Sequence, residues 1–287
     1  MLRFSSFLKE DYNELIEKLI TLGGKAYPKF GNVVIMAGGA GSGKGFVKDN
    51  LLGLEGYIFD PDDLKSLASR TPTIIKKIKD EMGIDLKDLA ANLSNPDNVS
   101  KLHSIIGDYL ELDSARKKAF YRSALLAPAE RKPNIIFDVT LKDLRKLQNI
   151  SRDVEALGYS KKNIHIVWVV NDIEIAKKQN LDPERGRVVP VEILVNTHRG
   201  ASQTMLDIVN MGKKLKKYMD GDIVFAFNKI GVDSTLVKSK RGGSYVKDAN
   251  YFYIKRSGKP VQSLKDVSSD VKRKIAKYVP PNAEWDR

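Results

Sequence analysis

A glycine-rich stretch holds the residues with the clearest chemical potential. It reads Gly38-Gly39-Ala40-Gly41-Ser42-Gly43-Lys44-Gly45 and lies between an apolar run and a segment with helical pattern. Glycines in such a loop let successive backbone N–H groups curl around an anion, and the helix N-terminus adds partial positive charge. We therefore predict that residues 39–45 bind a nucleotide, with Lys44 bridging the β- and γ-phosphates.

Gly45 departs from the common form of this loop, in which a Ser or Thr hydroxyl at this position binds magnesium. Adenylate kinases and their relatives also place Gly after the lysine, so the stretch resembles that branch of the P-loop kinases. The resemblance implies that the loop binds ATP. It also implies that Mg²⁺ is held by the nucleotide, by water and by carboxylates elsewhere in the chain.

Four aspartates supply the candidate carboxylates. Asp60, Asp62 and Asp63 follow one apolar run, and Asp138 ends another. Ligands of open α/β sheets bind beyond the carboxyl ends of the strands, so these aspartates fall near the glycine-rich loop if the strands are adjacent. Phosphoryl transfer needs one carboxylate to deprotonate the acceptor and others to anchor the metal, for which we take Asp60 and Asp138. The alternative for residues 60–63 is a turn with a helix cap.

The segment "FDPDDLK", residues 59–65, resembles a motif of the P-loop kinases that include zeta toxins and phage polynucleotide kinase. The resemblance implies that Asp62 takes the proton of the acceptor hydroxyl. It also implies that Lys65, with Asp63 beside it, binds the acceptor. The segment "IIFDVTL" is similar to the family's Asp-Gly-Thr segment, with Val139 in place of the Gly.

Ile175 to Leu194 resembles the arginine-bearing lid of these kinases, centred on residues 180–189. By this resemblance, Arg185 and Arg187 close over ATP, exclude water and neutralise charge on the transferred phosphoryl group. The planar guanidinium suits this task because it pairs phosphate oxygens in a bidentate manner. The alternative is two arginines that face solvent on a surface loop.

The wider pattern predicts an α/β fold. Apolar runs without alternation, separated by helical patterns, indicate a doubly wound parallel sheet of the P-loop NTPase kinase type, with three αβα layers. We expect a kinase domain over residues 1–230 with a helical insert at about 66–133, followed by a basic C-terminal extension over 231–287. The predicted strands are Val33–Ala37, Tyr57–Phe59, Ile135–Phe137, Ile164–Val170 and Ile223–Phe227, with a further short strand in "DANYFYIKRSG".

The charge bears on the acceptor. Of the net +13, residues 201–287 hold 18 Lys and Arg against 9 Asp and Glu. Residues 237–259 interleave cations with Tyr and Phe, a mixture that can follow a phosphate backbone and stack on bases. This favours DNA or a polynucleotide as acceptor, a hydroxymethylated base of phage DNA being one form. Alternatives are a small nucleotide-sugar acceptor, as in zeta toxins, an ATP-dependent binder without transfer, and a basic surface that is merely solvated.

Composition excludes several classes of site. The chain has no cysteine, so disulfides and thiolate metal sites are excluded, and we expect no haem. We expect no secretory signal, no membrane span and a cytoplasmic location. His165 lies in a predicted strand and is expected in the core, whereas His103 and His198 lie in helical patterns without a visible partner.

Overall fold

The computed structural model describes residues 20–25, 27–181, 188–227, 236–238, 244–246 and 251–260. The strands are β1 Val33–Ala37, β2 Tyr57–Phe59, β3 Ile135–Asp138, β4 Ile164–Val170, β5 Ile223–Phe227, β6 Leu236–Lys238, β7 Ser244–Val246, β8 Tyr251–Arg256 and β9 Lys259–Pro260. The helices are α2 Lys44–Leu51, α3 Pro61–Ala68, α4 Pro72–Met82, α5 Leu86–Ala91, α6 Pro96–Ser104, η1 Ile105–Tyr109, α7 Leu112–Leu126, η2 Ala129–Arg131, α8 Leu144–Ala156, η3 Lys161–Asn163, α9 Ile173–Asn180, α10 Val191–Asn210 and η5 Gly212–Lys217.

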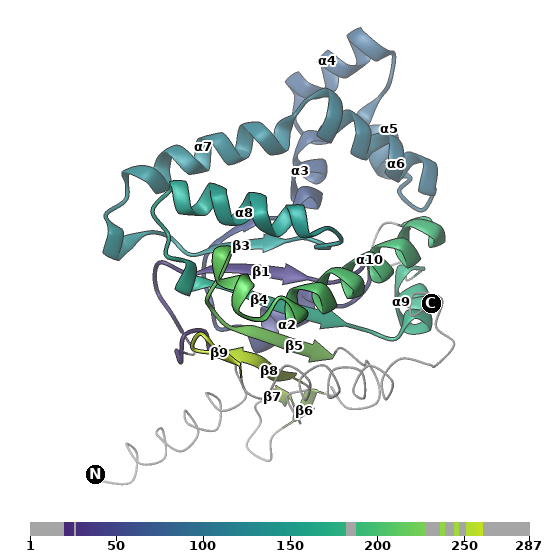
Figure 1. Ribbon diagram of the computed structural model, residues 1–287. Coiled ribbons are helices and arrows are strands. Elements are labelled where there is room, and N and C mark those ends of the chain that lie inside the picture. Colours follow the sequence, from purple (N-terminus) through teal and green to yellow (C-terminus); the bar gives the residue numbers. More distant parts are fainter. Residues whose placement is uncertain are drawn as a thin grey trace, which may run out of the picture.

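One sheet organises the molecule (Figure 1). Its strand order is β2-β3-β1-β4-β5-β8-β9, and the first five strands are parallel. These five are the strands predicted from the apolar runs, so the α/β prediction is confirmed. The sheet is mixed because β8 pairs with β5 in the antiparallel direction, and β9 pairs with β8. Both belong to the predicted C-terminal extension, yet they continue the main sheet.

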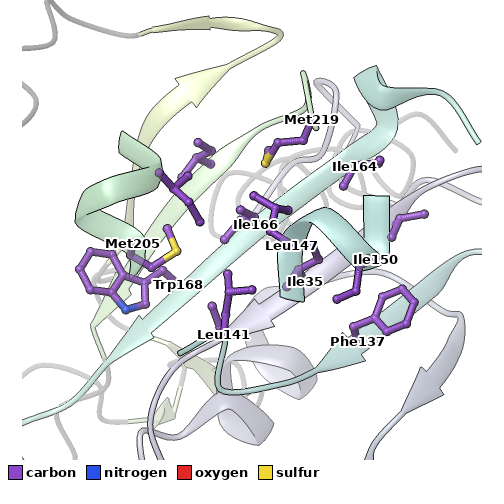
Figure 2. Packing of buried hydrophobic residues seen from close by; sticks show 14 of the residues in the cluster. Ile35, Phe137, Leu141, Leu147, Ile150, Ile164, Ile166, Trp168, Met205 and Met219 are labelled. Carbon is purple, nitrogen blue, oxygen red and sulfur yellow. The ribbon is translucent and has the colours of Figure 1, made fainter. Parts of the chain in front are cut away.

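Successive side chains of each strand point to opposite faces, which produces two cores. On β1, Val33, Ile35 and Ala37 face a cluster that also holds residues of α7, α8 and α10. Val34 and Met36 face the other cluster, which includes Val47 and Leu51 of α2. Figure 2 shows the first cluster, in which Met205 of α10 and Leu147 of α8 pack over strand residues such as Trp168 of β4. Burial on both faces explains why these strands read as continuous Val and Ile runs.

The region predicted to be a helical insert is helical and has a core of its own. Helices α4, α5 and α6 pack with η1 and α3 around a third cluster of buried residues, which contains Ile78, Leu86 and Leu102. The Asn95 side chain caps the start of α6, since it accepts a hydrogen bond from the N–H of Asp97 at 3.0 Å. The insert stands apart from the sheet, beyond α3 (Figure 1).

Two further predictions concern the ends of the chain and membranes. Residues 261–287 of the predicted C-terminal extension lie outside the described residues, as do residues 239–243 and 247–250 of its aromatic and basic stretch. Within the described ranges, no helix is both long and apolar enough to cross a membrane.

Candidate phosphate-binding site

The glycine-rich stretch forms a tight loop between β1 and α2. Gly38, Gly41 and Gly43 adopt φ angles of 149°, 74° and 88°, which side-chain-bearing residues rarely adopt. The loop closes on itself through a hydrogen bond from the N–H of Ser42 to the carbonyl of Gly39 at 3.2 Å. Its last residues lead into the first turn of α2, whose N–H groups face outward from the helix end. The loop therefore has the backbone form that an anion site requires.

Lys44 lies inside this loop rather than in solvent. Its Nζ donates to the carbonyl oxygens of Gly38 and Gly39 at 3.1 and 3.4 Å, and lies 3.6 Å from Oδ1 of Asp138. Asp138 ends β3, the strand adjacent to β1, so the sheet itself brings the two charges together. The structure thus joins Lys44 and Asp138, which the sequence analysis had placed in one site.

Two side chains of helix α10 hold the loop in place. The Thr197 hydroxyl accepts a hydrogen bond from the N–H of Ala40 at 3.0 Å, and Nε2 of His198 lies 2.7 Å from the Ala40 carbonyl oxygen. The His198 ring also fills the space beside Gly39, where a Cβ would overlap it. The sequence showed no partner for His198, and the structure provides one. Its partner is the loop backbone, 158 residues away.

His198 is 4% exposed, and burial lowers its pKa to about 4, although the hydrogen bond with Ala40 acts in the other direction. The positive charge of Lys44 lowers the pKa further. The imidazole is therefore neutral at physiological pH and donates from Nε2 to the carbonyl oxygen of Ala40. A neutral ring can support the loop without adding a fixed charge beside the predicted phosphate position.

Two buried polar atoms at the loop lack a hydrogen-bond partner among the described residues. They are the hydroxyl of Ser42 and the Oδ1 of Asn171, on side chains that are 0% and 1% exposed. The amide nitrogen of Asn171 donates to the carbonyl of Gly41 and to Oε1 of Gln179, both at 3.3 Å. Buried polar atoms are nearly always satisfied, so an unsatisfied pair beside an anion loop fits a site that is completed by a ligand and its water.

The predicted lid is anchored at its base. Asn180, which is 1% exposed, donates to the carbonyl of Val189 at 2.6 Å and accepts from its N–H at 2.9 Å. The N–H of Val188 donates to the carbonyl of Leu93 in the helical insert at 2.8 Å. The predicted lid arginines, Arg185 and Arg187, lie outside the described residues, so their role stays a prediction. The end of the lid segment is nevertheless tied to the insert.

The structure describes the residues predicted near the acceptor less completely than it describes the loop. Asp60 follows β2, which is separated from β1 by β3, so it lies one strand farther from the loop than Asp138 does. Asp62 and Asp63 fall in the first turn of α3, and their side chains are outside the described part. Lys65 is half-buried in the same helix. The segment is a helix start with Pro61 at its first position, a usual place for proline.

Arg116 of α7 is a residue that the sequence analysis missed. Its guanidinium donates to the carbonyl of Ile58 at 2.9 Å and to that of Asp60 at 3.5 Å, and stacks over the rings of Tyr57 and Phe59. It therefore fixes the carboxyl end of β2, where the predicted acceptor residues begin.

Metal ligands were predicted at Asp60 and Asp138. Within the described ranges, no group of three or more His, Asp or Glu side chains could hold a metal ion. An Mg²⁺ ion at this site would therefore need oxygens of a nucleotide and of water in addition to Asp138.

In comparisons with known proteins, the chain is similar to solved structures only. No family model and no curated protein matches the chain. The AvrRxo1-ORF1:-ORF2 complex with ATP is 11% identical with a TM-score of 0.48, over 86% of this chain and 64% of that one. A structure of the PezAT toxin–antitoxin system of Streptococcus pneumoniae is 14% identical with a TM-score of 0.42, over 96% and 95%. TT1252 from Thermus thermophilus is 16% identical with a TM-score of 0.34, over 87% and 98%.

This chain thus spans less than two thirds of the AvrRxo1 chain in the complex with ATP. All three TM-scores are below 0.5.

Proposed function

We propose that the protein is an ATP-dependent phosphotransferase with a hydroxyl acceptor. The observation that carries the proposal is the position of Lys44, whose Nζ lies within a glycine loop of left-handed backbone and 3.6 Å from Asp138 at the carboxyl end of the neighbouring strand. A half-buried Lys–Asp pair at the N-terminus of a helix is suited to bind a polyphosphate and its metal.

ATP, when bound, supplies the phosphoryl group. The loop N–H groups and Lys44 would hold its phosphates, and Asp138 would orient the metal-bound water. Asp62, in the first turn of α3, would take the proton of the acceptor hydroxyl. Lys65 and Asp63 would bind the acceptor, and Arg185 and Arg187 would close over the transferred group.

Two acceptor classes remain as candidates. The excess of Lys and Arg in residues 201–287 favours DNA or a polynucleotide, including a hydroxymethylated base. The alternative acceptor is a small nucleotide or nucleotide sugar. The hydrogen bond from Val188 to Leu93 joins the end of the lid segment to the insert, an arrangement that would suit a small acceptor better than a DNA duplex.

Transfer of γ-labelled phosphate from ATP tests the proposal. The acceptors are duplex DNA with hydroxymethylated bases, oligonucleotides with a 5′-hydroxyl, and a pool of nucleotide sugars. Lys44→Ala and Asp62→Asn should abolish transfer, whereas the matched variants Lys48→Ala, on the next turn of α2, and Asp80→Asn, on the exposed side of α4, should retain it.

The pattern of label distinguishes the acceptors. Label in DNA with a steep salt dependence identifies a nucleic-acid kinase, and label in the sugar pool with a shallow one identifies a small acceptor. ATP turnover that is unchanged in Asp62→Asn, without label in any acceptor, would refute phosphoryl transfer by this residue. Stabilisation of the fold by ATP, lost in Lys44→Ala alone, is an independent readout of nucleotide binding.

A further inference from the structure

A small apolar groove lies between the end of α10 and the β8–β9 hairpin. Its volume is about 80 Å³, enough for an aliphatic side chain. One wall is formed by Ile208 and Leu215, and the other by Ile254 and Pro260, with Ile223 at the base. Figure 1 shows β8 and β9 on the outer side of β5, away from the strands that carry the glycine loop.

Lysines surround this groove because of the sequence of η5. The segment reads Gly-Lys-Lys-Leu-Lys-Lys and forms a 3₁₀-helix, in which residues three apart lie on the same side. Lys213 and Lys216 therefore both line the groove, while Leu215 is buried against the core. Lys214 and Lys217 are exposed on the neighbouring side.

The hairpin adds charge from the other wall. Arg256 and Lys259 are exposed, and Lys255 lines the groove. Asp220 offsets part of this charge, since it lies 2.8 Å from Nζ of Lys255 and 3.5 Å from Nζ of Lys216. Of the lysines that line the groove, Lys213 lies outside this ion-paired group. Further exposed cations lie on the two elements that form the walls of the groove, so these elements have an excess of positive charge: Lys214, Lys217, Arg256 and Lys259.

The groove is separate from the phosphate site. Ile223, at its base, is the first residue of β5, whereas the glycine loop follows the last residue of β1, and β4 lies between the two strands. On α10, Ile208 at the groove is ten residues beyond His198 at the loop, or about 15 Å along the helix axis. A ligand in the groove would leave the loop accessible.

We propose that this groove is a docking site for an acidic amphipathic peptide segment of a partner protein. Such a segment would place one aliphatic or aromatic side chain in the groove and its carboxylates against the lysines of η5 and the hairpin. The apolar walls favour a peptide over nucleic acid, because a phosphate backbone would use the lysines and leave the groove unfilled. The excess of cations makes an acidic segment the complementary one.

Fluorescence anisotropy with a designed probe tests this site on the full chain. The probe is a fluorescein-labelled helical peptide with leucines on one face and glutamates on the other. Control peptides replace either all glutamates with glutamine or all leucines with serine. We expect the probe to bind, both control peptides to bind more weakly, and binding to weaken as salt is raised.

Protein variants locate the binding. The double variant Lys213→Glu with Lys216→Glu should lower the affinity for the probe by about tenfold. Each exposed charge pair contributes a few-fold to affinity, and reversal of the charge adds repulsion. Pro260→Trp, at an exposed position that lines the groove, should fill the groove and lower the affinity for the probe as well. The matched control is Lys76→Glu with Lys77→Glu, which makes the same charge change on the exposed side of α4.

Several results would overturn the proposal. Equal weakening by both lysine pairs would mean non-specific attraction, and no binding by the unaltered chain would mean that the groove is not an open peptide site. The site would be a nucleic-acid surface instead if single-stranded DNA competed with the probe and its affinity fell in Lys213→Glu/Lys216→Glu but not in Pro260→Trp. Circular dichroism spectra that match the unaltered chain establish that the variants are folded.

Discussion

Replacement of Gly39 by alanine tests the contact between the glycine loop and α10. A Cβ on Gly39 would lie 2.6 Å from Nε2 of His198, and closer still to two carbons of the ring. The ring would have to move, which breaks its hydrogen bond with the carbonyl of Ala40. Overpacking of a buried site costs about 1–3 kcal/mol, and a buried hydrogen bond contributes about 1 kcal/mol. Gly39→Ala should therefore lower the free energy of unfolding by about 2–4 kcal/mol.

A double-mutant cycle with His198→Ala isolates this contact. Without the imidazole, a methyl group at residue 39 has room, so Gly39→Ala should cost little in the His198→Ala background. We expect a coupling free energy of about 2–4 kcal/mol, measured by urea denaturation of the four proteins. Additive effects, within about 0.5 kcal/mol, would refute the packing of His198 against the loop.

Three further predictions concern single residues. Because His198 has a pKa of about 4 when folded and near 6.5 when unfolded, the free energy of unfolding should fall by up to about 3 kcal/mol as pH drops through this window. His198→Gln should flatten that fall in urea denaturation, and an unchanged slope would contradict a buried neutral ring. Gly45→Ala should raise the free energy of unfolding by about 0.5 kcal/mol, because residue 45 is helical and nothing lies within 4 Å of a Cβ there. A lower free energy of unfolding in the same assay would refute the open, helical environment of residue 45. Asn180→Ala should speed hydrogen exchange at the N–H of Val189 by about tenfold, and an unchanged rate would show that this hydrogen bond does not close the lid base.

The central fold was predictable because burial leaves a direct mark on sequence. Val33–Ala37 and Ile164–Val170 are buried on both faces, so no polar residue interrupts the pattern except His165. His165 is 1% exposed, as expected, and its Nδ1 accepts a hydrogen bond from the N–H of Asp222. The glycine loop was predictable for a related reason, since its left-handed backbone angles restrict the residues that can occupy it.

The supports of the loop were not predictable, because their contacts join residues far apart in sequence. Thr197 and His198 reach Ala40 only after the intervening strands have been ordered in the sheet, and no local pattern encodes that order. Asn171 and Asn180 are polar residues in otherwise ordinary helix–strand boundaries, with no spacing that marks them. The antiparallel pairing of β8 with β5 likewise depends on the path of a long connection, whereas the strand itself was visible in its Tyr and Ile content.

The contact of Arg116 with β2 has a consequence for assembly of the protein from its nascent chain. β2 is the outermost strand of the sheet on that side, and the carbonyls of Ile58 and Asp60 point away from β3. Exposed strand edges of this kind pair readily with other chains and begin aggregation. Arg116 occupies both carbonyls, but it belongs to α7, which is synthesised after α3, α4, α5 and α6. These helices must therefore be synthesised, and α7 must dock, before this edge is closed to strand addition by a neighbouring molecule.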